Sequence, residues 1–162
     1  KVDRDFLPLS HAPAGGPDML FEFDDFFLVV EVTLTSSSRQ EAAEGEPVRR
    51  HVAEIAERFE ESGKRVYCLF IAVDINSNTA ETFKIGSWYK KDDSKLPLQI
   101  VPMALADFIA LFRAGLESGN LTPRGLMQLL TFCRALSNRD APEWKKDIKT
   151  EVEKFIEDLK RI

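Results

Sequence analysis

A chain of 162 residues, of which 44% are hydrophobic, is long enough to enclose one continuous core and short for two domains. The formal net charge of −5 argues against a freestanding module that holds nucleic acid by general electrostatic attraction. The sequence contains neither an apolar run long enough to span a membrane nor a secretory leader, so we expect a cytoplasmic protein.

The chain begins at Lys1 without an initiator methionine. We therefore expect it to be a piece of a longer protein, with an upstream segment missing. We expect residues 1–162 to form a single domain. The two cysteines, Cys68 and Cys133, lie in a strand-like and a helix-like run without paired spacing. This arrangement predicts buried structural thiols and gives little support to a disulfide or a zinc site.

The first part of the chain predicts a β-hairpin that follows a loop. Residues 6–17 hold three prolines and two glycines among small side chains, which is typical of a loop. The aromatic and β-branched runs 19–23 and 26–34 come next, separated by Asp24 and Asp25. Two such runs around a short acidic turn predict paired antiparallel strands.

A helix is predicted after residues 35–46, a polar segment that we expect to be a loop or an irregular turn. Pro47 suits the first helical position, and Gly63 suits the residue after the last turn. The almost continuously apolar run 65–73 then predicts a strand covered on both faces, so this helix connects two strands of a mixed sheet. Its apolar residues recur at helical spacing: Val48, Val52, Ile55 and Phe59.

The second half predicts one more strand and then helices. A short helix at residues 80–85 precedes a strand at 98–103. Thr122 and Asp140 are suitable N-caps for the second and third of the helices that follow. Sheet first and helices afterwards indicate an α/β fold, with a mixed sheet flanked by helices and a helical C-terminal layer. The predicted helices span residues 104–116, 123–136 and 142–162.

The last predicted helix repeats apolar residues at spacings of three and four. Such a stripe packs into the core of its own domain or forms a coiled-coil-like interface with a partner, and core packing is the simpler interpretation. The stripe consists of Ile148, Val152, Phe155, Leu159 and Ile162.

The predicted hairpin brings two acidic residues together. Pairing about the centre between Asp24 and Asp25 joins residues whose numbers sum to 49, so Asp18 lies opposite Glu31. Opposed residues project to the same face, with Cβ atoms roughly 4.5 to 5.5 Å apart. Because adjacent carboxylates repel each other and Mg²⁺ prefers oxygen ligands, the pair predicts a metal site. The alternative is an exposed Glu31 on an edge strand, with Asp18 starting a turn.

The residues around Glu31 favour the buried alternative. A fully exposed strand face would be polar two residues before and two residues after Glu31, yet Val29 is apolar and only Thr33 conforms. A carboxylate buried in an apolar strand needs a cation or a proton.

Pro17–Asp18 followed by Glu31–Thr33 resembles the PD-(D/E)XK nuclease signature. Residues 11–52 are similar to the catalytic stretch of AlwI-like type IIS restriction endonucleases and related nicking enzymes. Residues 78–89 are similar to the same family and, more loosely, to the FokI cleavage domain. The resemblance covers residues 3–112, and it implies a restriction-endonuclease-like sheet core.

This resemblance implies a Mg²⁺ cofactor, with Mn²⁺ as a substitute. The carboxylates of Asp18 and Glu31 and the main-chain carbonyl of Val32 would be its ligands. Thr33 stands at the signature's lysine position and cannot supply an ammonium group. In the resembling group that position is likewise a threonine, and a glutamate thirteen residues after the first one, here Glu44, completes the site.

We expect Glu44 to lie beside the positive end of the helix predicted to start at Pro47, where it would orient the attacking water or bind a second ion. Two alternatives remain for this position. Glu44 is a solvated charge in a polar run, or the neighbouring Glu46 takes the role.

Several side chains that follow the catalytic strand closely enough to face a DNA phosphate are candidates for contact with it, and arginine suits phosphate by its forked donors. They are Arg39, Gln40, Arg49 and Arg50, and each of them is alternatively an ordinary solvated residue on a helix. His51 shares a helix face with apolar residues, so a core histidine with its hydrogen bonds satisfied is favoured over a catalytic base.

The activity implied by the resemblance is that of a type II site-specific deoxyribonuclease acting on double-stranded DNA. No recognition motif is evident, so we expect a DNA-recognition domain or subunit. One domain offers one active site, so cutting both strands requires a dimer or a second nuclease subunit. The alternatives are a DNA repair or recombination nuclease with the same metal core, or a catalytically degenerate fold acting as an interaction module.

Overall fold

The centre of the protein is a five-stranded mixed sheet with the strand order β1-β2-β3-β4-β7. This computed structural model describes residues 8–11 and 15–161. The first three strands pair antiparallel, whereas β4 and β7 continue the sheet parallel to β3. The strands are β1 (Ser10–His11), β2 (Met19–Glu22), β3 (Phe26–Thr33), β4 (Arg65–Ala72) and β7 (Gln99–Ala104).

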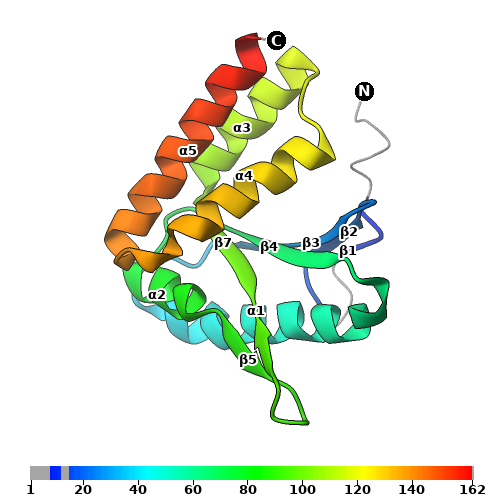
Figure 1. The fold of residues 1–162 in the computed structure, drawn as a ribbon. Helices are drawn as coiled ribbons and strands as arrows, with labels where there is room; N and C mark the ends of the chain where they lie inside the picture. The colour runs from blue at the N-terminus through cyan, green and yellow to red at the C-terminus, as the bar shows by residue number, and fades with distance from the viewer. Residues whose placement is uncertain (1–7, 12–14, 162) are drawn as a thin grey trace.

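Helices cover both faces of the sheet (Figure 1). The helices α1 (Arg39–Arg58) and α2 (Ser77–Ile85) lie on one face. The other face carries α3 (Leu105–Ser118), α4 (Pro123–Ala135) and α5 (Ala141–Arg161). The predicted α/β fold, a mixed sheet flanked by helices with a helical C-terminal layer, is therefore confirmed.

The hairpin register predicted from the sequence is also confirmed. Met19 pairs with Val30 and Glu22 with Phe27, so paired residue numbers sum to 49. Odd-numbered residues of β3 face α1, where the ring of Phe27 stacks on Phe59 with centroids 4.2 Å apart. Even-numbered residues face the opposite side, where Leu28, Val30 and Val32 line a pocket together with residues of α3. The alternation of a strand therefore puts Glu31 on the α1 side.

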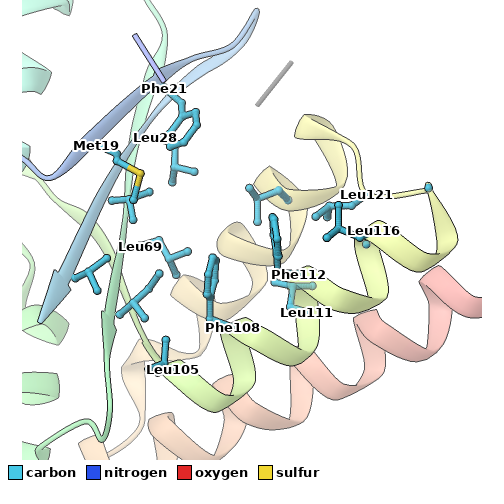
Figure 2. Close-up of a pocket in the computed structure, with 16 residues that line it drawn as sticks. Met19, Phe21, Leu28, Leu69, Leu105, Phe108, Leu111, Phe112, Leu116 and Leu121 are labelled. Carbon is cyan, nitrogen blue, oxygen red and sulfur yellow. The ribbon is translucent and has the colours of Figure 1, made fainter. Parts of the chain in front are cut away.

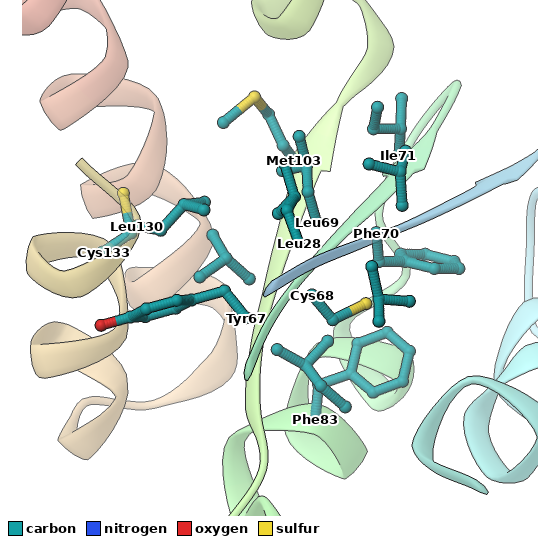
Figure 3. Close-up of a cluster of buried hydrophobic side chains, with 14 of the residues drawn as sticks. Leu28, Tyr67, Cys68, Leu69, Phe70, Ile71, Phe83, Met103, Leu130 and Cys133 are labelled. Atoms are coloured by element: carbon teal, nitrogen blue, oxygen red, sulfur yellow. The ribbon is translucent and has the colours of Figure 1, made fainter. Parts of the chain in front are cut away.

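The strand β4 is buried on both faces, as its continuous apolar run predicts. On the α1 side, Phe70 meets Phe83 of α2 edge to face, with centroids 5.0 Å apart. On the other side, the Tyr67 hydroxyl lies 2.7 Å from the Thr131 hydroxyl of α4. Figure 3 shows these layers, with Leu69 and Met103 also in the core. This packing fixes the position of β3 beside it.

The start predicted for the first helix was wrong. Helix α1 begins at Arg39, and Pro47 lies inside it. Residues 39–46 are rich in Glu and Ala, which are good helix formers, and burial of the apolar face of α1 offsets the hydrogen bond that Pro47 cannot donate. Gly63 ends the short 3₁₀ turn Glu60–Ser62 after α1, with φ of 68°. Only residues 35–38 of the predicted loop are outside regular structure.

The secondary structure in the second half of the chain also differs from the prediction. Helix α2 starts at Ser77, three residues early, because the Asn76 side chain caps it by accepting the Asn78 N–H at 2.9 Å. A hairpin of β5 (Ser87–Tyr89) and β6 (Lys95–Pro97) was not predicted, nor was β1. The predicted cap Thr122 is confirmed, since its hydroxyl accepts the Gly125 N–H at 3.1 Å.

The apolar stripe of α5 packs into the core of its own chain. Ile148, Val152 and Leu159 are all buried, and Phe155 packs against them, so the coiled-coil alternative does not hold for this stripe. Ile162 lies outside the described residues. Both cysteines are free and buried, and burial raises the pKa of Cys133 to about 12. Within residues 8–11 and 15–161, no helix combines the length and apolar character that crossing a membrane requires.

Candidate functional site

Asp18 and Glu31 lie side by side at the open end of the hairpin. Asp18 comes one residue before β2, and its main-chain N–H donates to Glu31 Oε2 at 3.4 Å. The Val32 N–H donates to Asp18 Oδ2 at 2.7 Å. The proximity predicted from the register is thus present, and it places both acids on the edge of β3 that faces β2.

The Glu31 carboxylate is buried in this position. Glu31 is only 8% exposed, and burial raises its pKa, with the negative charge of Asp18 adding to that effect. A hydrogen bond with His51, from His51 Nδ1 to Glu31 Oε1 at 2.7 Å, acts in the opposite direction. A buried carboxylate beside a second one is stabilised by a cation or a proton, which is the electrostatic requirement of a metal ligand.

His51 reaches Glu31 from α1. Its side chain is 12% exposed and its Nδ1 has a partner, so the geometry fits the prediction of a core histidine at that nitrogen. The sequence did not predict Glu31 as the partner of His51, however, because the apolar residues on the same helix face indicated only a position in the core. Contact with the central acid of the site makes His51 a candidate for orienting Glu31.

Glu44 reaches the same region from the second turn of α1. The Thr33 hydroxyl donates to Glu44 Oε1 at 2.7 Å. Because α1 begins at Arg39, Glu44 does not lie beside the start of the helix, and that part of the prediction was wrong. The rival Glu46 has a side chain 63% exposed and pairs with Arg50 at 3.5 Å, so it points away from the two acids.

Val32 contributes its main chain to the site. Its side chain is 43% exposed on the opposite face of the sheet, while its N–H binds Asp18. The N–H and C=O of a strand residue point to the same edge, so the Val32 carbonyl also faces the Asp18 side of β3. This orientation suits the role of metal ligand predicted for that carbonyl.

The donors around Glu31 fit a hard cation such as Mg²⁺. They are carboxylate and carbonyl oxygens, which Mg²⁺ prefers, and water and substrate phosphate would supply its remaining ligands. Among the described residues, no group of three or more His, Cys, Asp and Glu side chains is arranged to enclose a metal ion. A site with one or two protein carboxylates is compatible with that observation, whereas an all-protein cage is not.

The arginines proposed for phosphate contact have different environments. Arg49 donates to the Ser87 carbonyl and lies over the Trp88 ring, with its guanidinium carbon 5.9 Å from the ring centroid. It therefore ties the β5–β6 hairpin to α1. Arg39 is exposed at the start of α1, and Arg50 is 38% exposed between two glutamates. Arg39 and Arg50 are thus more accessible to solvent than Arg49.

Gln40 does not lie where it could contact a phosphate, as was predicted for it. It is completely buried, and its amide nitrogen donates to the carbonyls of Thr35 and Asp74, each at 2.8 Å. Its amide oxygen accepts the Asn76 N–H at 2.9 Å. Gln40 therefore joins the segments that follow β3 and β4, and we correct the phosphate assignment to a structural one.

An apolar pocket of about 440 Å³ lies on the other face of β3 (Figure 2). Met19 and Leu28 line it from the sheet, and Phe108 and Phe112 line it from α3. All its lining residues are apolar or glycine, so it offers no side-chain ligand for a metal ion and no side-chain donor for a phosphate. We therefore place the candidate chemistry on the α1 side.

Replacing Glu31 with Gln is expected to stabilise the metal-free protein at neutral pH. A glutamate whose pKa is raised by folding favours the folded state below its ordinary pKa and loses that contribution as the pH rises through the folded pKa. The Glu31→Gln variant should therefore match the wild type at acidic pH and exceed it in melting temperature above that range. Thermal unfolding in chelator across the pH range measures this, and a variant that is less stable at pH 7 would contradict it.

The family model of the AlwI restriction endonucleases matches residues 1–111. The chain is also similar to a solved structure, the small subunit (R.BspD6I2) of the heterodimeric restriction endonuclease R.BspD6I. The two are 26% identical with a TM-score of 0.64, and the match covers 97% of this chain and 75% of that one. No curated protein matches this chain.

Proposed function

The chain belongs to the AlwI restriction endonuclease family, and on this premise we propose that it is a Mg²⁺-dependent endonuclease that hydrolyses phosphodiester bonds of double-stranded DNA. The observation that carries the proposal is the convergence of Asp18 and Glu31 at the edge of β3. The PD-(D/E)XK signature that this pair completes is part of the proposal.

Each residue of the site has a separate role in the proposed reaction. Asp18, Glu31 and the Val32 carbonyl would hold the cation. Mg²⁺, or Mn²⁺ in its place, would supply charge stabilisation on the phosphate and lower the pKa of a bound water. Glu44 orients the attacking water by accepting a hydrogen bond from it, and His51 keeps the Glu31 carboxylate in place. The products would be a 5′-phosphate and a 3′-hydroxyl.

We propose that the chain acts as the cleavage domain or subunit of a type IIS-like enzyme and depends on a partner for DNA recognition. Its net charge of −5 is unsuited to tight DNA binding without help. The similar solved structure is a subunit of a heterodimeric enzyme, which supports a second subunit here. A partner of this kind, or a second copy, would also provide the active site for the second strand.

Incubating the protein at high concentration with supercoiled plasmid and Mg²⁺ or Mn²⁺ tests this function. We expect slow conversion to nicked circles that chelator abolishes, together with Mg²⁺ binding in calorimetry. The absence of both would favour a catalytically degenerate interaction module, an alternative to which Thr33 in place of lysine lends support.

A further inference from the structure

Thr33 occupies a defined place between β3 and α1. It lies two residues after Glu31 on the same face of the strand, about 7 Å further along it. Its hydroxyl accepts the Thr35 N–H at 3.0 Å and donates to Glu44 Oε1 at 2.7 Å. Because the Thr35 amide can only donate, the hydroxyl proton is directed to Glu44.

Apart from the hydrogen bond from Thr33, few neighbours are placed to hold the Glu44 carboxylate. Residues three and four positions away on a helix are the ones that contact a side chain, and here they are Gln40, Glu41, Pro47 and Val48. None of these carries a positive charge, and the Gln40 amide is used by main-chain groups. Within the described part of the chain, the hydrogen bond from Thr33 is the contact shown for the Glu44 carboxylate.

A hydrogen bond from Thr33 can fix a side chain that is otherwise free to turn. A glutamate has three rotatable side-chain bonds, and their restriction costs conformational entropy. Threonine is β-branched and therefore stiff about its first side-chain bond. The hydrogen bond from this stiff side chain on β3 offsets the entropic cost in the folded protein. Substrate binding then does not have to restrict the Glu44 side chain.

We propose that Thr33 is a positioning residue whose hydroxyl holds the Glu44 carboxylate on the Glu31 side of β3. This inference rests on the proposed function, because it gives Glu44 its place in the hydrolytic site. In this proposal Thr33, at the position of the signature's lysine, acts on the reaction through Glu44 and does not contact the substrate.

Thr33→Val removes the hydroxyl with little change of shape and tests the proposal. We expect kcat for plasmid nicking to fall about 10- to 100-fold, the loss that is typical when a partner orienting an active-site group is removed, with KM for DNA nearly unchanged. Thr33→Ser should restore most of the rate. In a Glu44→Ala background, Thr33→Val should cause no further loss. Thr150→Val, on the exposed surface of α5, is the matched control.

A second measurement does not depend on activity. In nuclear magnetic resonance of the metal-free protein, we expect a protected Thr33 hydroxyl proton with a nuclear Overhauser effect to the Glu44 side chain, and its loss in Glu44→Ala. Wild-type kcat in Thr33→Val, failure of Thr33→Ser to restore it, or losses that add to those of Glu44→Ala would each overturn the proposal. If the wild type cuts no DNA, the proposed function fails, and the hydroxyl resonance alone decides whether Thr33 holds Glu44.

Discussion

Replacing Glu31 with Gln is expected to lower the rate of plasmid nicking by about 10³-fold, which corresponds to about 4 kcal/mol of lost transition-state stabilisation. The amide of glutamine keeps the shape of the side chain and can still contact His51, but it carries no charge to hold the cation. Asp18→Asn should have an effect of the same order, because the two carboxylates share the site. Single-turnover nicking at saturating Mg²⁺, together with calorimetric titration of the ion, measures both losses.

Asp24→Asn is the matched control for these substitutions. Asp24 is exposed at the turn of the same hairpin, at the far end from Glu31, so its replacement should leave the cleavage rate within twofold. A Glu31→Gln protein that binds Mg²⁺ and cuts DNA as the wild type does would remove Glu31 from the site. Its expected gain in stability separates a loss of chemistry from a loss of folding, since a misfolded variant would lose both.

The hairpin and the acidic pair could be predicted because local rules determine them. Side chains alternate along a strand, and a turn centred between Asp24 and Asp25 allows one pairing that keeps both apolar runs in register. The position of Glu31 opposite Asp18 follows from that register alone. The run 65–73 was equally informative, since a strand in the middle of a parallel arrangement is apolar throughout.

The α1 side of the site could be predicted only in part, because Pro47 was taken as the start of the helix. With α1 starting at Arg39, Glu44 and His51 lie two turns apart on one face and both reach β3. That spacing was present in the sequence and would have linked His51 to the acids. The burial of Gln40 had no such signal, because its partners are main-chain groups after two different strands.

Gln40→Met is expected to lower the free energy of unfolding by about 3 kcal/mol, because it leaves buried main-chain groups without partners. The carbonyls of Thr35 and Asp74 and the N–H of Asn76 all bond to this one amide. Methionine has nearly the volume of glutamine, so a cavity contributes little to the change. Unfolding in urea, followed by circular dichroism, gives the value.

The same substitution distinguishes the structural role of Gln40 from contact with DNA. Gln128→Met, on the exposed surface of α4, changes the same side chain where no buried group depends on it, and it should shift stability by less than about 0.5 kcal/mol. If Gln40 contacted a phosphate, Gln40→Met would raise KM for DNA and leave the urea midpoint unchanged. We expect the reverse, a lower midpoint with KM for DNA unchanged in the fraction that remains folded, because the Gln40 amide is committed to the segments that follow β3 and β4.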